Sequence, residues 1–183
     1  MEPLPGATSR TLDPSAVTTD DAELYKSISA RAAKGVAVIT TVHRGWDHAA
    51  TVTDVLSVSY DPPTMVASIY GLSRLAEAIE ESGRWGISLL SARQKGIAEQ
   101  LGEPGSPLVG LLDQVPHFRT EPGAPPLLRD ALAWFELRTV AEHPAATHTL
   151  FVGEVTWMGR PDQDPPPPLV RYQSAYHGAA SRA

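Results

Sequence analysis

Hydroxyl side chains recur between His48 and Pro63, in a segment that reads HAATVTDVLSVSYDPP. Alternate residues of a strand point to the same face, so one face of this segment would carry Thr51, Thr53, Val55, Ser57 and Ser59. Hydroxyl groups both donate and accept hydrogen bonds, which suits a polar, planar or phosphorylated ligand. Half-exposed strands are also rich in Ser and Thr, and on this segment alone that simpler explanation is favoured.

The sequence motifs of several other enzyme classes are absent. The chain has no Gly-rich dinucleotide fingerprint, no phosphate loop, no nucleophile elbow and no zinc helix with paired histidines. It also has no cysteine, which excludes disulfides and thiolate metal sites. The pairs His43/His48 and His143/His148 are each separated by five positions, a spacing that puts the two members on opposite faces of a strand. We therefore expect no metal site.

Length and charge favour a single soluble domain of 183 residues. The formal net charge of -6 argues against nucleic acid, whose phosphates bind basic surfaces. The N-terminus has no basic region followed by an apolar stretch, so we expect no secretory signal. No apolar run approaches the roughly 20 residues that a membrane helix needs. These features predict a cytoplasmic protein that binds neither nucleic acid nor membranes.

Apolar periodicity and turn residues predict a mainly β fold with a few short helices. The predicted strands are 36–43, 48–59, 64–70, 85–90, 115–119, 131–141 and 148–158. Helices are expected from about Asp20 to Gly35, from a Ser73 cap to Gly83, and after Ser91. Many strands in hairpins favour a closed or nearly closed antiparallel barrel.

The barrel is expected to occupy residues 20–178. The preceding residues, 1–19, are small and polar without apolar periodicity, which predicts a flexible N-terminal tail. Residues 179–183 form a short C-terminal tail. Five prolines between 161 and 168 predict an extended connector.

Motifs along the chain carry a resemblance to a known family. SVSYDPP at 57–63 is followed by a strand and then by Ser73 and Arg74, and HTLFVGEV stands at 148–155. In the order and spacing of these segments, the chain resembles the flavin reductase family over about Tyr25 to Tyr176. The resemblance implies an FMN-binding split barrel, a Greek-key barrel that binds flavin near a homodimer interface.

Site residues follow from the resemblance. The segment Thr51, Val52, Thr53 and Asp54, with Ser57 and Ser59 beyond it, would border the isoalloxazine ring and ribityl chain. Ser73 and Arg74 would hold the flavin phosphate, since a helix N-terminus with a hydroxyl and a cation is a good anion site. Tyr172 and Tyr176 would belong to a wall shared by the two subunits.

The activity implied is reduction of FMN, or of FAD, by NADH or NADPH. His148 would orient the nicotinamide or compensate charge on the reduced flavin. No strong acid or base is required, because the cofactors carry the chemistry while the protein supplies orientation and electrostatics. In the family, the reduced flavin usually passes to a separate flavin-dependent monooxygenase.

Some positions depart from the family pattern. Leu75 replaces a usual Thr and removes one phosphate donor, which predicts moderate affinity and a flavin that exchanges as a substrate. Asp54 replaces a usual Ser or Asn and interrupts the apolar face of its strand, so it either ends regular pairing or serves a ligand. The turn before His148 also differs, with Ala146 and Thr147 in place of Gly and Asp.

Other functions of the same fold stay open. One is a different split-barrel oxidoreductase, of the pyridoxamine phosphate oxidase-like or deazaflavin-dependent kind. Another is a flavin-binding or flavin-sensing protein without catalysis. A third is a haem-binding barrel, for which His143, His148 and His177 are the axial candidates.

Overall fold

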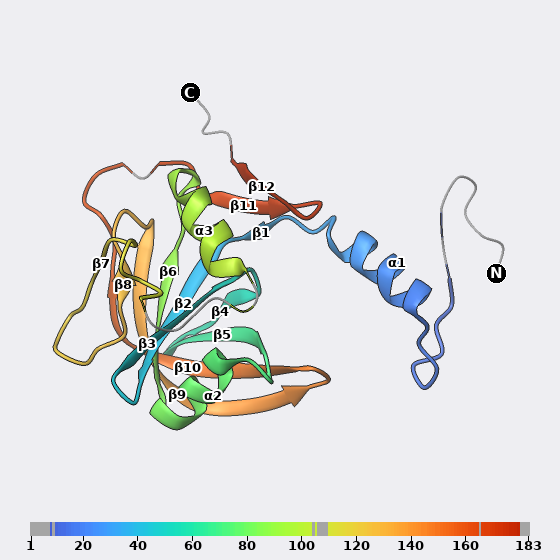
Figure 1. Cartoon of the computed structure of the whole chain (residues 1–183), viewed down its shortest axis with the longest axis horizontal. Coiled ribbons are helices and arrows are strands. Elements are labelled where there is room, and N and C mark those ends of the chain that lie inside the picture. Colours follow the sequence, from blue (N-terminus) through green and yellow to red (C-terminus); the bar gives the residue numbers. More distant parts are fainter. Residues whose placement is uncertain (1–7, 9, 104, 106–109, 165, 180–183) are drawn as a thin grey trace.

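A seven-stranded antiparallel sheet curls into the barrel at the centre of the molecule (Figure 1). The computed structural model describes residues 8, 10–103, 105, 110–164 and 166–179. The sheet order is β3-β2-β6-β9-β10-β5-β4. The strands are β2 (Ala37–His43), β3 (Trp46–Val52), β4 (Val55–Tyr60), β5 (Pro63–Tyr70), β6 (Arg84–Leu89), β9 (Ala133–Ala145) and β10 (His148–Gly159). The edge strands β3 and β4 are consecutive in the chain, so the sheet is nearly closed, as predicted.

The segment predicted as one strand over 48–59 forms two strands, so that prediction is wrong. β3 pairs with β2, and β4 pairs with β5, with Thr53 and Asp54 between them outside any strand. The Asp54 carboxylate accepts from the Lys34 ammonium at 2.5 Å, and its carbonyl accepts from the Ser68 N–H at 2.9 Å. These bonds hold the chain as it leaves one edge strand for the other, so Asp54 ends regular pairing.

Two apolar clusters lie on opposite faces of β2. Inside the barrel, Ile39 packs with Trp85 and Phe151, all three fully buried. On the outer face, Val38 packs in a second cluster with Leu101 of α3 (Lys95–Gly102). Because both faces of β2 are covered, this strand is a rigid base for the adjoining β3.

Helix α2 (Arg74–Ser82) forms as predicted. The Ser73 hydroxyl accepts from the Ala76 N–H at 3.1 Å, which caps the helix. Gly83, with a φ of 64°, ends it in the left-handed conformation that glycine adopts without strain. Leu75 and Ile79 are buried in the interior cluster, so the helix N-terminus is fixed against the barrel. None of the described helices combines the length and apolar character needed to cross a membrane.

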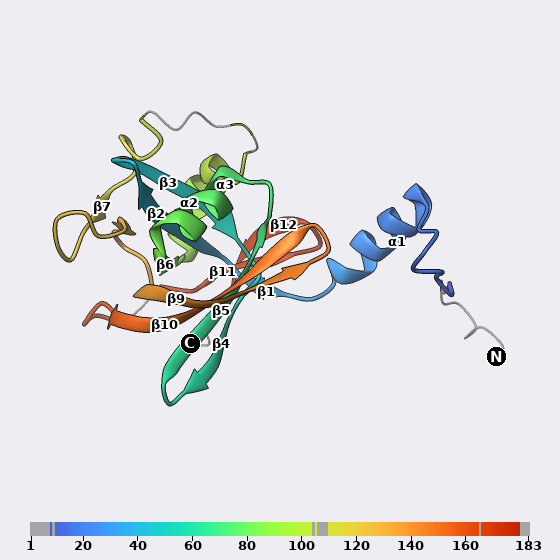
Figure 2. The ribbon, with the colours of Figure 1, turned by 90° about the horizontal axis from the view of Figure 1, so that it is seen from below.

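The first helix, α1 (Thr19–Ser29), projects away from the barrel (Figures 1 and 2). Its predicted end at Gly35 is wrong, because the helix stops at Ser29 and β1 (Lys34–Gly35) pairs with β11. A capping box between Thr18 and Asp21 defines its start. Within the expected tails, residues 1–7, 9 and 180–183 lie outside the described residues.

A C-terminal hairpin, β11 (Leu169–Tyr172) and β12 (Ala175–Gly178), was not predicted from the sequence. Its turn is formed by Gln173 and Ser174, both with positive φ, and contains none of the Gly or Asn residues that usually signal such a turn. The hairpin forms a three-stranded sheet with β1. It places Tyr172 and Tyr176 on separate strands.

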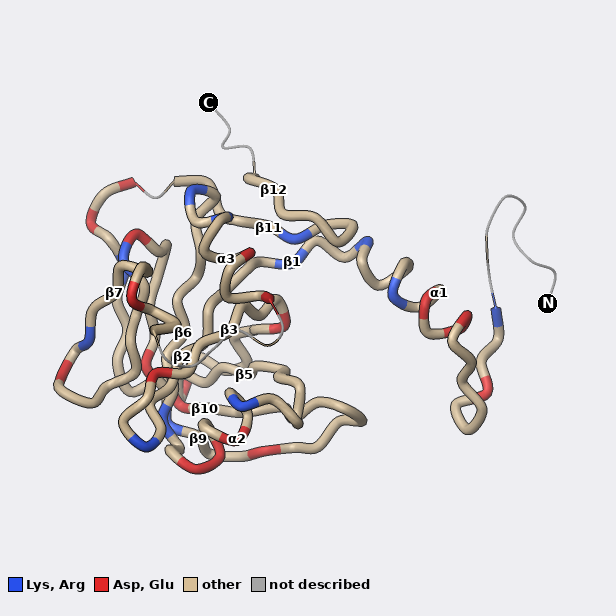
Figure 3. The backbone as a smooth tube through the Cα atoms, in the orientation of Figure 1, with Lys and Arg blue, Asp and Glu red and all other residues tan. Residues whose placement is uncertain are grey.

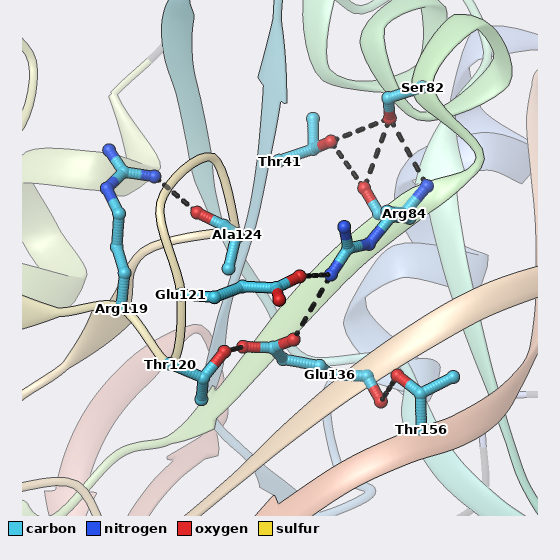
Figure 4. A network of polar contacts seen from close by, with 9 residues as sticks. All are labelled: Thr41, Ser82, Arg84, Arg119, Thr120, Glu121, Ala124, Glu136 and Thr156. Atoms are coloured by element: carbon cyan, nitrogen blue, oxygen red, sulfur yellow. Dashed lines mark hydrogen bonds and ion pairs between the residues drawn. The ribbon is translucent and has the colours of Figure 1, made fainter.

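A polar network fixes the loop between β7 (His117–Phe118) and β8 (Leu127–Leu128) to the barrel (Figure 4). The buried Glu136 carboxylate accepts from the Thr120 hydroxyl and lies 3.7 Å from the Arg84 guanidinium. Arg84 also donates to Glu121 at 2.9 Å. The carboxylate of Glu136 is therefore paired within the structure.

The short helix η1 (Ala92–Gln94) precedes α3.

Candidate functional site

A cavity of about 340 Å³ lies where the N-terminus of α2 meets β3 and β5. We call it the α2 cavity, and Ser73, Arg74, Tyr70, Ala50 and His48 are among the residues that line it. The Ser73 oxygen accepts from the helix backbone, so its O–H remains able to donate. The Arg74 guanidinium has no ion pair within the described residues. The structure thus brings together the two residues predicted to bind a phosphate.

His148 lies beside this cavity through its contact with Tyr70. The two residues are partners in the β5–β10 register, and their rings meet edge to face with centroids 5.8 Å apart. The Nδ1 atom of His148 is 3.0 Å from the Thr147 hydroxyl, which orients the exposed ring and leaves Nε2 available to a ligand. Although Thr147 departs from the family pattern at this turn, its hydroxyl still holds the His148 ring.

Thr53 and Asp54 line a different cavity, of about 470 Å³, which we call the Asp54 cavity. Its walls combine apolar side chains of Leu56, Val66 and Leu150 with polar groups of Thr53 and Ser68. The ion pair with Lys34 compensates the negative charge of Asp54. Apolar walls with polar edges are typical of sites for planar ligands.

Thr51 and Tyr176 meet at the C-terminal end of α3. The Thr51 hydroxyl donates to the Ala98 carbonyl at 2.9 Å, so it supports the helix. A Cβ atom at Gly102 would lie 3.6 Å from the Tyr176 hydroxyl and 3.7 Å from Cβ of Thr51. Tyr172 lies on the other strand, where its ring meets that of His177. Tyr172 and Tyr176 therefore lie on opposite faces of the hairpin, and the wall that they would share with a second subunit stays a prediction.

The hydroxyl row predicted over 51–59 does not form one face. β4 carries a bulge between Ser57 and Ser59, and neither residue lines the α2 cavity or the Asp54 cavity. The Ser59 hydroxyl donates to the Asp61 carbonyl at 3.1 Å. Val52 packs against the interior apolar cluster.

Sequence reasoning missed His48, which lines the α2 cavity. It is only 7% exposed, and its Nδ1 atom has no hydrogen-bond partner within the described part of the chain. The pKa of His48 is lowered, first by burial and then by the neighbouring His43. The two histidines lie on adjacent strands joined by a tight turn, with ring centroids 6.2 Å apart. The sequence spacing of His43 and His48 predicted opposite faces of one strand, and that prediction is wrong. The five positions between them span the turn of the β2–β3 hairpin.

Electrostatics distinguish the two ends of the segment 48–54. At the α2 cavity, Arg74 and the N-terminus of α2 both favour an anion. At the other end, the Asp54 cavity is apolar and locally compensated in charge. Elsewhere on the barrel, acidic and basic residues are interspersed (Figure 3). The two cavities therefore favour different ligand groups, an anion at the α2 cavity and a planar apolar group at the Asp54 cavity.

A cavity of about 730 Å³ lies against the proline-rich connector and contains Arg93 and Arg129, but none of the predicted site residues. Among the described residues, no group of three or more His, Cys, Asp or Glu side chains could hold a metal ion. The α2 and Asp54 cavities therefore form the candidate site.

Comparison with known proteins covers this same region. A family model described as flavin reductase like domain matches residues 29–180. The NADH-dependent flavin reductase StyB of Pseudomonas fluorescens is 34% identical over 161 residues, covering 86% of this chain and 90% of that protein. An NADH-dependent FMN reductase of Streptomyces nodosus subsp. asukaensis is 31% identical over 150 residues, covering 78% of this chain and 76% of that protein. The solved styrene monooxygenase flavin reductase of Pseudomonas putida is 31% identical with a TM-score of 0.74, covering 87% of this chain and 99% of that one.

Proposed function

This chain belongs to the flavin reductase-like family, and from that premise we propose that it is an NADH-dependent flavin reductase. The observation that carries the proposal is the placement of Ser73 and Arg74 at a helix N-terminus in the α2 cavity. The segment that runs past this cavity continues to Thr53 and Asp54, which line the apolar Asp54 cavity. In the reaction, a hydride and its two electrons move from nicotinamide C4 to flavin N5, giving NAD⁺ and reduced flavin.

The residues of the chain bind and orient in this scheme. Ser73 and Arg74 would donate to the flavin phosphate, and Thr53 and Ser68 would bond the edge of the ring. His148 would orient the nicotinamide through its free Nε2 atom, because its ring is already held by Thr147. Holding two planar rings in contact converts an encounter in solution into a positioned transfer.

We propose NADH as the hydride donor, since the relatives are named as NADH-dependent, with NADPH as the alternative. FMN or FAD is the proposed flavin, because both carry the ring and the phosphate that the two cavities suit. Reduced flavin would then leave for a separate monooxygenase, the kind of partner named for the styrene monooxygenase relative.

We also propose that the chain forms a homodimer. The β4–β5 hairpin extends from the barrel (Figure 2), and Leu56, Val58 and Tyr60 on it are largely exposed. Apolar side chains gathered on one element are typical of a surface that a partner covers. A second copy at this hairpin would also close the Asp54 cavity, since Leu56 lines it.

The proposed activity is tested by following NADH and NADPH oxidation with FMN, FAD and riboflavin in turn. We expect turnover that saturates with flavin. Flavin binding without oxidation of either nucleotide would indicate a flavin sensor and would contradict the proposal. An absorption spectrum of the purified protein distinguishes flavin from haem.

A further inference from the structure

A second cavity, of about 280 Å³, adjoins the α2 cavity between the β2–β3 hairpin and α2. We call it the hairpin cavity. It is lined by His43, Arg44, Trp46, His48, Arg74, Glu77 and Ala78. His48 and Arg74 line both cavities, so they stand at the junction between the two. A ligand group held at Arg74 in the α2 cavity therefore has space beyond it.

His48 indicates that the junction receives a polar ligand. Its ring is buried, yet its Nδ1 atom has no partner within the described residues. Buried polar atoms are almost always bonded to protein or to water, because leaving one unpaired is costly. The His48 ring stands in the wall between the two cavities with this atom shielded from solvent, so a bound group reaches it once the ring turns toward the cavity.

The charges around the hairpin cavity favour an anion. Arg44 and Arg74 carry permanent positive charge, and no ion pair within the described part of the chain involves either. His43 on β2 adds a titratable group, while Glu77 on α2 is the carboxylate among the lining residues. The nearby Asp47 carboxylate is already occupied, since it accepts from Arg119 at 2.6 and 2.7 Å.

Trp46 adds a flat aromatic surface to this positive site. It begins β3, opposite His43 in the register, and about half of the side chain is exposed. Indole faces stack well on nucleobases. A phosphate group and a purine together match the chemistry that the cations and Trp46 offer.

We propose that the hairpin cavity binds the second phosphate and the adenosine of FAD. The inference rests on the proposed function, and it continues the flavin from a first phosphate held by Ser73 and Arg74. His48 at the junction bonds the pyrophosphate, Arg44 pairs with its charge, and Trp46 stacks on the adenine. FMN ends at the junction, so FAD gains contacts that FMN lacks and binds more tightly.

Binding titrations without nucleotide test this subsite. Quenching of flavin fluorescence gives dissociation constants for FAD, FMN and riboflavin on the full-length protein. We expect FAD to bind about tenfold more tightly than FMN, equivalent to one extra favourable contact. Arg44→Gln and Trp46→Leu should each bring the ratio of the FMN and FAD constants toward one. The matched control Arg93→Gln removes a cation from the other large cavity and should keep the wild-type ratio.

ADP provides a second measurement that does not depend on the variants. It should compete with FAD and should not displace riboflavin, because riboflavin does not reach the hairpin cavity. Equal affinities for FMN and FAD, or an unchanged ratio in Arg44→Gln and Trp46→Leu, would overturn the subsite. If FMN is still reduced by NADH in that case, the proposed function stands and only the subsite fails. If no flavin is bound or reduced, both fail.

Discussion

The His148 ring is held by two neighbouring side chains, those of Thr147 and Tyr70. Thr147 contacts its Nδ1 atom, and the Tyr70 ring supports it at the rim of the α2 cavity. We expect His148→Ala to lower the rate of flavin reduction by about one to three orders of magnitude, as for loss of one positioned group. The dissociation constant for flavin should stay within about twofold, because Ser73 and Arg74 remain. Stopped-flow reduction with NADH measures the rate.

The matched control is His143→Ala, which removes an exposed histidine from β9. It should leave the rate unchanged. If His148→Ala behaves like this control, His148 is a surface residue without a role in the reaction.

The ion pair between Lys34 and Asp54 sets the charge at the edge of the Asp54 cavity. Removing the carboxylate with Asp54→Asn leaves the Lys34 cation unpaired, which favours the reduced, more anionic flavin. The midpoint potential of bound flavin should then rise by a few tens of millivolts, about 1 to 2 kcal/mol at an effective dielectric near 20. The reverse change, Lys34→Gln, should lower the potential. Potentials that do not respond to either variant would place the ring away from this pair.

Single residues show where sequence reasoning worked. The Ser73 cap and the Arg74 cation after it were predictable because a helix start depends on a few neighbouring positions, and their contact with a phosphate stays a prediction. The shared face of Thr51, Ser57 and Ser59 was predicted wrongly, since it assumed an unbroken strand, while their contact with flavin stays a prediction. His48 was missed because its significance arises from the absence of a partner in three dimensions, which no spacing reveals.

The N-cap of α2, Ser73, contributes both to stability and to the proposed phosphate contact. Ser73→Ala removes the cap on the Ala76 N–H and should cost about 1 kcal/mol in the free energy of unfolding. The same change removes a hydroxyl donor from the α2 cavity, so FMN affinity should fall while riboflavin affinity changes little. Chemical denaturation and flavin titration measure the two effects. Ser73→Thr keeps the hydroxyl and serves as the control; equal losses for FMN and riboflavin would argue against a phosphate contact.

Elements with strong local signals were predicted well, and those set by tertiary pairing were not. α2 has both a cap and a C-terminal glycine, and β5 has a clear apolar run, so their bounds agree with the structure. β11 and β12 have a turn of Gln173 and Ser174 without a local signal, and they form because β1 provides a strand to pair with. The end of α1 depends on that same pairing.

At the scale of the whole molecule, the exposed β4–β5 hairpin predicts self-association. Val58→Glu places a charge among exposed apolar side chains and should shift the protein from dimer to monomer. Light scattering over a range of concentrations measures the change. Gln163→Glu adds the same charge on the proline-rich connector and should not alter the mass. A wild-type protein that is monomeric and still reduces flavin would contradict the proposed dimer.

Delivery of reduced flavin to another protein limits how tightly the whole molecule can hold it. Leu75 is buried in the barrel cluster and offers no hydroxyl to the α2 cavity, so the proposed phosphate contacts on α2 are limited to Ser73, Arg74 and backbone amides. We expect a dissociation constant near micromolar, about -8 kcal/mol, which orients the flavin and still permits release within a catalytic cycle. The protein should purify pale or partly loaded and lose its flavin on ultrafiltration, and added flavin should behave as a saturable substrate. Full occupancy that survives ultrafiltration would instead indicate a resident cofactor, because a flavin that cannot leave cannot serve a separate monooxygenase.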